Sequence, residues 1–190
     1  MTAQRLGGIL LLVSAVVFSI GAGITAIDLQ SEGPIGASGI QVVALSTLCG
    51  AVAATILAAN VPVQLNGSIA GNGFAILGLG LGALSLFELL ATANVDPAML
   101  IIFIVLLFVG FGGILVGAII LAIAMLRTAG APRSIAVLFL ISTGMIMLGI
   151  PNPPFLTLYG LAGGSASWVG LAILAIATPA SPGQVARSGR

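Results

Sequence analysis

Residues 97–126 read PAMLIIFIVLLFVGFGGILVGAIILAIAML, a run of thirty residues without an ionisable side chain. Asp96 precedes the run and Arg127 follows it. A helix rises about 1.5 Å per residue, so thirty residues span roughly 45 Å, the thickness of a bilayer with its headgroups. We therefore predict a central membrane-spanning helix over Pro97–Leu126, with Asp96 as its N-cap and Pro97 at its first position.

The whole chain has the same apolar character. Of its 190 residues 59% are hydrophobic and 5% are charged, and the mean hydropathy is +1.31. A soluble domain carries about a quarter charged residues, so this composition predicts an integral membrane protein that contacts the lipid bilayer. A net charge of +1 provides no basic patch, and we expect no nucleic acid as a partner.

Six apolar segments are separated by polar or proline-containing links. The predicted spans are Leu6–Ile27, Gly39–Ala59, Ile69–Ala91, Pro97–Leu126, Ser134–Ile150 and Phe155–Thr178. The expected fold is an all-α bundle of six transmembrane helices over residues 1–178, followed by a disordered cytoplasmic tail at 179–190. The first span is longer than the apolar region of a secretory signal, so we expect an uncleaved anchor.

The positions of the arginines predict the orientation in the membrane. With six spans both termini share one side, and all five arginines fall on that side: Arg5, Arg127, Arg133, Arg187 and Arg190. The positive-inside rule assigns this side to the cytoplasm. A hairpin at Gly110–Gly113 would place two of these arginines outside, so we reject it. Arginine without lysine is typical of a GC-rich genome, which favours a bacterial plasma membrane.

Many of the 27 glycines lie inside the predicted spans. Helices associate in lipid where small residues allow their backbones to approach closely. Three stripes of small residues have helical spacing: Gly71, Ala75, Gly78, Gly82 and Ser85; Gly110, Gly113, Gly117 and Ala124; and Gly160, Gly163, Ser167 and Gly170. We predict that these stripes pack the helices of one chain together; oligomerisation, or a pore lined by glycine backbone, is the alternative.

Glu88 is the one acid inside a predicted span, about one turn before the outer end of the third. A carboxylate within a membrane span is a functional candidate by default. Together with Ser85 and Thr92, which follow helical spacing, Glu88 is therefore a possible transport or ion site. The alternative, which its shallow position favours, is that Glu88 reaches the outer interface and marks the end of the helix.

Several kinds of site are excluded by missing residue types. The chain has no lysine and so no retinal Schiff base, and it has no histidine for haem, copper or zinc ligation. The single cysteine, Cys49, cannot hold an iron–sulfur cluster, and a Ser/His/Asp or Cys/His nucleophile is impossible. We therefore expect no catalytic site, no cofactor and no metal centre.

Two classes of function remain. The first is a non-catalytic accessory or scaffold subunit that packs with a membrane complex, or with a second copy, through its glycine-rich helix faces. The scarcity of charge within the spans favours it. The second is a small transporter or channel for a small solute or cation, with Glu88 in the outer vestibule. A water-filled cavity between the third, fourth and sixth helices would favour transport, and tight packing beside an apolar outer face would favour the subunit.

Overall fold

The computed structural model describes residues 2–30, 37–62, 65, 67–91, 99–128, 133–149 and 168–177. All the regular structure in these residues is helical. The helices are α1 (Ala3–Gln30), α2 (Ala37–Ala59), α3 (Gly67–Ala91), α4 (Leu100–Arg127), α5 (Arg133–Gly149) and a short sixth helix, Trp168–Ala177. The predicted all-α fold is confirmed.

Four helices within the described residues, α1 to α4, are long and apolar enough to cross a membrane. They indicate a multi-pass membrane protein. α5 has 17 residues and rises about 25 Å, slightly less than the hydrocarbon core of a typical bilayer. Most of the predicted sixth span, residues 155–167, lies outside the described residues, as does the predicted tail at 179–190.

The helix ends differ from the predicted spans by a few residues. α1 begins at Ala3 rather than Leu6 and ends at Gln30 rather than Ile27. Hydropathy marks the part of a helix that prefers lipid, whereas helical hydrogen bonding continues into polar residues at the ends. α4 runs unbroken through Gly110–Gly113, so the rejected hairpin is not formed. The predicted N-cap pair, Asp96 and Pro97, lies outside the described residues.

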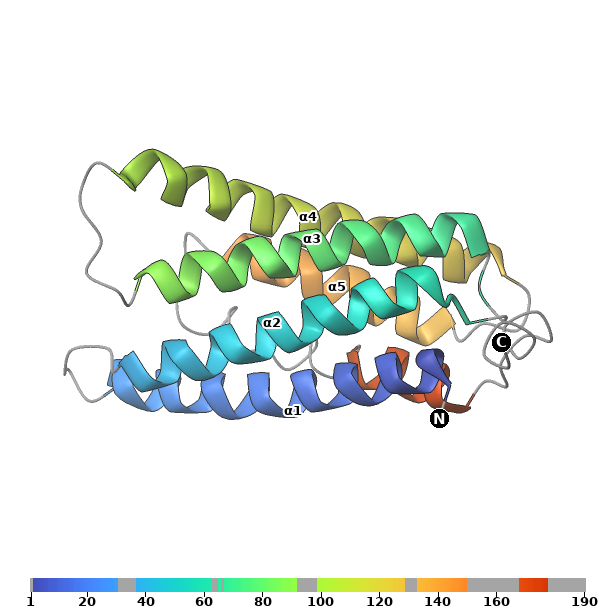
Figure 1. The fold of residues 1–190 in the computed structure, drawn as a ribbon, viewed down its shortest axis with the longest axis horizontal. Coiled ribbons are helices and arrows are strands. Elements are labelled where there is room, and N and C mark those ends of the chain that lie inside the picture. Colours follow the sequence, from blue (N-terminus) through green and yellow to red (C-terminus); the bar gives the residue numbers. More distant parts are fainter. Residues whose placement is uncertain are drawn as a thin grey trace.

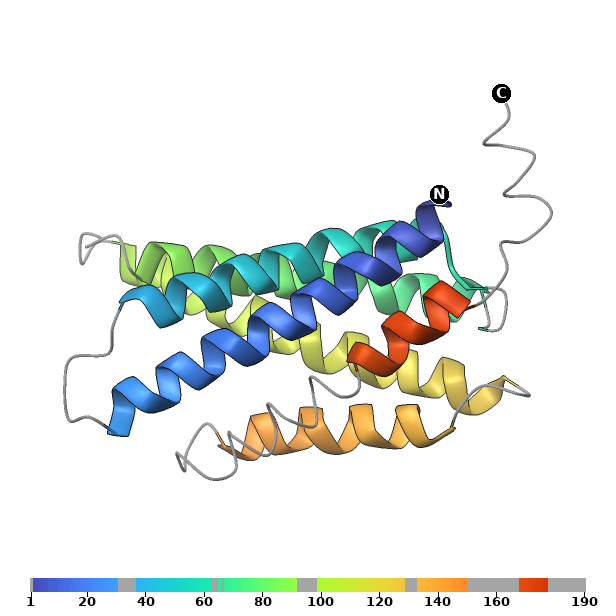
Figure 2. The same cartoon turned by 90° about the horizontal axis from the view of Figure 1, so that it is seen from below.

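Successive helices run antiparallel, and each long helix packs against its neighbour in the sequence (Figure 1). The first residues of α1 therefore lie at the same end of the bundle as the last turn of α4 and the first turn of α5 (Figures 1 and 2). These segments carry Arg5, Arg127 and Arg133. The three described arginines thus belong to one end of the bundle.

α3 and α4 meet backbone to backbone. A Cβ atom added to Gly80 would lie 2.6 Å from the backbone nitrogen of Ile114, and one added to Gly113 would lie 2.7 Å from the Cα of Gly80. A Cβ at Gly117 would lie 2.7 Å from the backbone nitrogen of Leu77. Real Cβ atoms do not approach so closely, so these positions require glycine.

The stripe predicted on α3 faces α2 instead of α4. A Cβ at Gly78 would lie 3.1 Å from the Thr55 hydroxyl, and one at Gly82 would lie 3.9 Å from the Cβ of Ala51. Gly78 and Gly80 differ by about 200° around a helix with 3.6 residues per turn. α3 therefore carries small residues on two opposite faces, one for each neighbour. Ala75, a member of the predicted stripe, is exposed.

The short helix Trp168–Ala177 packs against both α1 and α5 (Figure 2). A Cβ at Gly8 would lie 3.0 Å from the carbonyl oxygen of Ala172, and one at Gly170 would lie 2.9 Å from Ile135. The Gln4 amide also donates a hydrogen bond of 3.0 Å to the carbonyl of Ala175. These contacts join the two ends of the described chain. The other predicted glycines of this stripe, Gly160 and Gly163, lie outside the described residues.

The core of the bundle is formed by leucine and alanine. Leu57 of α2, Leu81 of α3 and Leu121 of α4 are almost fully buried and belong to one cluster. The opposite side of α4 is strongly exposed, and its Ile101 and Phe108 side chains each have 74% of their surface accessible. Such an apolar outer surface is suited to lipid contact.

Candidate functional site

Glu88 lies in the last turn of α3, three residues before its end at Ala91. Its carboxylate accepts a hydrogen bond of 2.9 Å from the hydroxyl of Thr47 on α2. Thr47 is buried and follows the start of α2 at Ala37 by ten residues, or roughly 15 Å of helix. Since helical side chains lean toward the N-terminus of their helix, the Glu88 side chain leans toward the middle of the bundle.

Thr47 connects Glu88 to the backbone of α2. Its hydroxyl lies 3.0 Å from the carbonyl oxygen of Ala44 and 3.2 Å from that of Val43. A hydroxyl has one proton to donate, so it serves either the carboxylate or a carbonyl at one time. If Glu88 is protonated, its own O–H donates to the Thr47 oxygen and the Thr47 proton turns to the carbonyl. The pair therefore accommodates a carboxylate and a carboxylic acid.

A groove of about 290 Å³ lies beside this pair, between α2 and α3. Its lining residues are Ile40, Val43, Phe87, Glu88 and Ala91. Each of these side chains is at least partly exposed, so the groove opens on the surface of the bundle. Phe87 packs edge-to-face on Phe103 of α4, with ring centroids 5.6 Å apart, which fixes the ring at the groove. Of the described residues that line the groove, Glu88 alone is ionisable.

Ser85 and Thr92 were predicted to accompany Glu88, and the structure describes only Ser85. Ser85 is buried and donates a hydrogen bond of 2.9 Å to the carbonyl of Ala44 on α2, so its hydroxyl ties α3 to α2. Thr92 lies outside the described residues. Thr47 takes the place beside the carboxylate. Thr47 is one of several polar residues within the predicted spans, and only the packing of α2 against α3 shows that it is the one beside Glu88.

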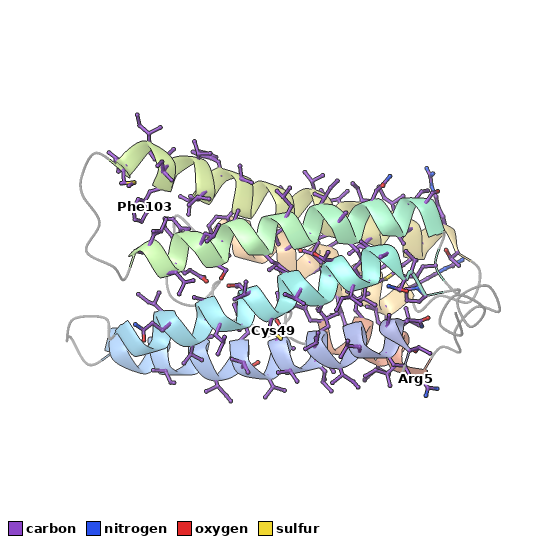
Figure 3. The ribbon with its side chains drawn as sticks, in the orientation of Figure 1. Arg5, Cys49 and Phe103 are labelled. Atoms are coloured by element: carbon purple, nitrogen blue, oxygen red, sulfur yellow. The ribbon has the colours of Figure 1, made fainter. Side chains whose placement is uncertain are left out.

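The arginines of the described chain lie far from this groove. Arg5 is at the opposite end of the bundle from the C-terminal turn of α3, together with the arginine-bearing ends of α4 and α5 (Figures 1 and 3). Among the described residues, Glu88 therefore receives no positive charge from this chain. The other three acids, Asp28, Glu32 and Asp96, have no described side chains.

The groove is not the cavity between the third, fourth and sixth helices that would favour a transporter. α3 and α4 are closed on each other by glycine, and such tight packing beside the exposed apolar side of α4 is the arrangement that favours the subunit. The groove instead lies on the other side of α3, against α2. Its lining residues lie within one turn of each helix, at 40 and 43 on α2 and at 87, 88 and 91 on α3. This spacing identifies a site only when it is known that α2 and α3 pack together.

Comparison with known proteins found no matching family model, no similar curated protein and no similar solved structure.

Proposed function

We propose that this chain is a small transporter or channel of the bacterial plasma membrane in which Glu88 binds a cation. The hydrogen bond from Thr47 to Glu88 is the observation that carries this proposal. A glutamate that only marked the end of α3 would extend into the headgroup region, as long polar side chains do near helix ends. Glu88 instead turns toward a threonine well inside α2, beside a groove that a ligand can enter.

The proposed topology has six spans with both termini in the cytoplasm. The arrangement of Arg5, Arg127 and Arg133 at one end of the bundle supports it, because cytoplasmic ends of spans carry the arginines. Glu88 then lies in the outer half of the membrane. α5 and the helix that includes Trp168–Ala177 are the fifth and sixth spans of this arrangement.

This topology predicts the side on which each terminus lies. Green fluorescent protein folds and fluoresces on the cytoplasmic side of a bacterial membrane but not after export through the general secretion channel. We expect fluorescence when it is fused to either end of the chain. A dark fusion at one end, with the protein present in the membrane by immunoblot, would require an odd number of spans and would overturn the proposed orientation.

The transport proposal predicts that flux depends on the carboxylate. Purified protein in liposomes is tested with protons, rubidium, tetramethylammonium and benzyltrimethylammonium. We expect at least one of these cations to cross, and we expect Glu88→Gln to reduce its flux by at least about tenfold, since a neutral amide cannot balance the charge. Glu88→Asp keeps the charge and serves as the conservative control, with partial activity expected. Equal flux through wild type and Glu88→Gln would refute the role of Glu88.

An accessory or scaffold subunit is the second candidate, and the exposed apolar side of α4 favours it. Ile101 and Phe108 present a broad surface there, while α3 closes the other side of α4. Purification from native membrane in a mild detergent distinguishes the two candidates. A stoichiometric membrane-protein partner, combined with no flux of any of the four cations, would replace transport by the subunit role.

A further inference from the structure

We infer that the Glu88 groove binds an organic ammonium ion that carries an apolar group. This inference rests on the proposed function and names the chemical class of its ligand. It follows from three properties of the groove: an acidic group without a positive partner in the described chain, few oxygen atoms among the described lining residues, and apolar walls of limited volume.

The charge of the site favours a cation. A carboxylate in apolar surroundings is costly unless it is paired and hydrogen-bonded. Thr47 supplies one hydrogen bond to Oε2 of Glu88. Arg5 lies at the other end of the bundle (Figure 3), as do the arginine-bearing ends of α4 and α5 (Figure 1), so a bound cation would supply the positive charge that the described chain does not.

The oxygen atoms at the site favour an organic cation over a metal ion. Calcium takes six to eight oxygen ligands and magnesium six. Among the described residues, the lining of the groove supplies one carboxylate, and Thr47 adds one buried hydroxyl. The nearby carbonyls of Val43 and Ala44 belong to the α2 helix and already lie near the Thr47 hydroxyl. An ammonium ion with carbon substituents needs no such oxygen shell.

The walls favour an apolar group on that cation. Ile40, Val43 and Ala91 offer aliphatic contact, and Phe87 adds an aromatic ring, a group that attracts quaternary ammonium ions. A volume of about 290 Å³ lies near the lower limit of ligand pockets, roughly 300 Å³. The groove therefore suits a small ammonium ion that carries one ring.

The test measures equilibrium binding of radiolabelled benzyltrimethylammonium to the full chain in nanodiscs of zwitterionic lipid. We expect saturable binding, with at least about tenfold weaker affinity for Glu88→Gln, since loss of a close charge pair between apolar walls costs more than one factor of ten. Competition should be strong with unlabelled benzyltrimethylammonium and at least about tenfold weaker with tetramethylammonium, which lacks the apolar ring. Neopentylbenzene, the neutral analogue of the probe, should not compete.

A second variant tests the walls without touching the carboxylate. Ala91→Phe adds a ring inside the groove and is expected to weaken binding at least about fivefold. Ala75→Phe makes the same change at an exposed position of the same helix and should leave affinity unchanged. If Ala91→Phe binds as wild type does while Glu88→Gln does not, the proposed apolar pocket is refuted.

The remaining outcomes separate this inference from the transport proposal. Absence of saturable binding to wild type, with flux of protons or rubidium that depends on Glu88, would refute the organic ligand and leave transport standing. Equal affinity for tetramethylammonium and the benzyl probe would refute the apolar ring of the ligand and leave transport standing. Saturable binding that depends on Glu88, without flux of any cation, would support the ligand class and refute transport. Binding unaffected by Glu88→Gln would refute the inferred site.

Discussion

Gly80→Ala is expected to destabilise the folded protein by about 2–3 kcal/mol, as overpacking of a tight core does. The added Cβ would lie 2.6 Å from the backbone nitrogen of Ile114 and 2.8 Å from the carbonyl oxygen of Gly110. Neither atom can rotate away, so α3 and α4 must separate to admit the methyl group. The unfolding free energy is measured by titration with sodium dodecyl sulfate in mixed micelles, followed by the fluorescence of the single tryptophan, Trp168.

Gly112→Ala is the matched control. A Cβ at Gly112 meets no atom within 4 Å, although Gly113 beside it touches the backbone of Gly80. Both substitutions gain the better helix propensity of alanine, about 1 kcal/mol, so this gain cancels in the comparison. We expect Gly112→Ala to be neutral or mildly stabilising. If the two variants unfold at the same detergent fraction, the close approach of α3 and α4 is wrong.

The sequence predicted the helices well because membrane spans are defined by composition. A long run without charge has one stable form in lipid, a helix that satisfies its own backbone, so α4 could be identified from Pro97–Leu126 alone. Its partners could not. Lipid supplies no amphipathic pattern that points each helix toward the core, because the outer face is as apolar as the inner one.

The glycines of α3 illustrate this ambiguity. One stripe that includes Gly78 and Gly82 was recognised in the sequence, but the tightest contact of α3 is at Gly80, on the opposite face. Gly78 and Gly80 both have helical spacing with other small residues, but on different faces of α3. The spacing in the sequence shows which faces of a helix carry small residues. It does not show which neighbouring helix covers each face, because that depends on the order and rotation of the helices in the bundle.

Glu88 was identified as a candidate for a reason that holds for any acid in a span, but its surroundings were not predictable. Its partner, Thr47, lies 41 residues earlier in the chain. Finding it requires knowing that α2 and α3 are adjacent and how far each is rotated. Ser85, three residues from Glu88 and therefore a natural guess, faces the carbonyl of Ala44 instead. Distance along one helix was a poor guide to contacts between two.

Leu121→Ala is expected to cost about 2 kcal/mol, at the lower limit of such changes in soluble proteins. Leu121 is fully buried in the α3–α4 core, where it lies against Gly73. In a soluble protein this cost includes the lost free energy of transferring the deleted methyl groups from water into the apolar core. When a membrane protein unfolds, its core side chains move into lipid, which is as apolar as the core. The transfer cost therefore nearly vanishes, and the cost that remains is the loss of packing around the cavity. Unfolding by sodium dodecyl sulfate measures the change.

Leu79→Ala distinguishes packing from simple loss of apolar surface. Leu79 is 62% exposed in the middle of α3, so its truncation leaves no cavity, and we expect a change within about 0.5 kcal/mol. The two substitutions remove the same atoms, one facing the core and one facing the bundle surface. Equal costs would mean that the side chains have equivalent surroundings, which contradicts the described packing. A large cost for Leu79→Ala alone would show that its face is covered by a partner, and this result would strengthen the subunit interpretation over transport.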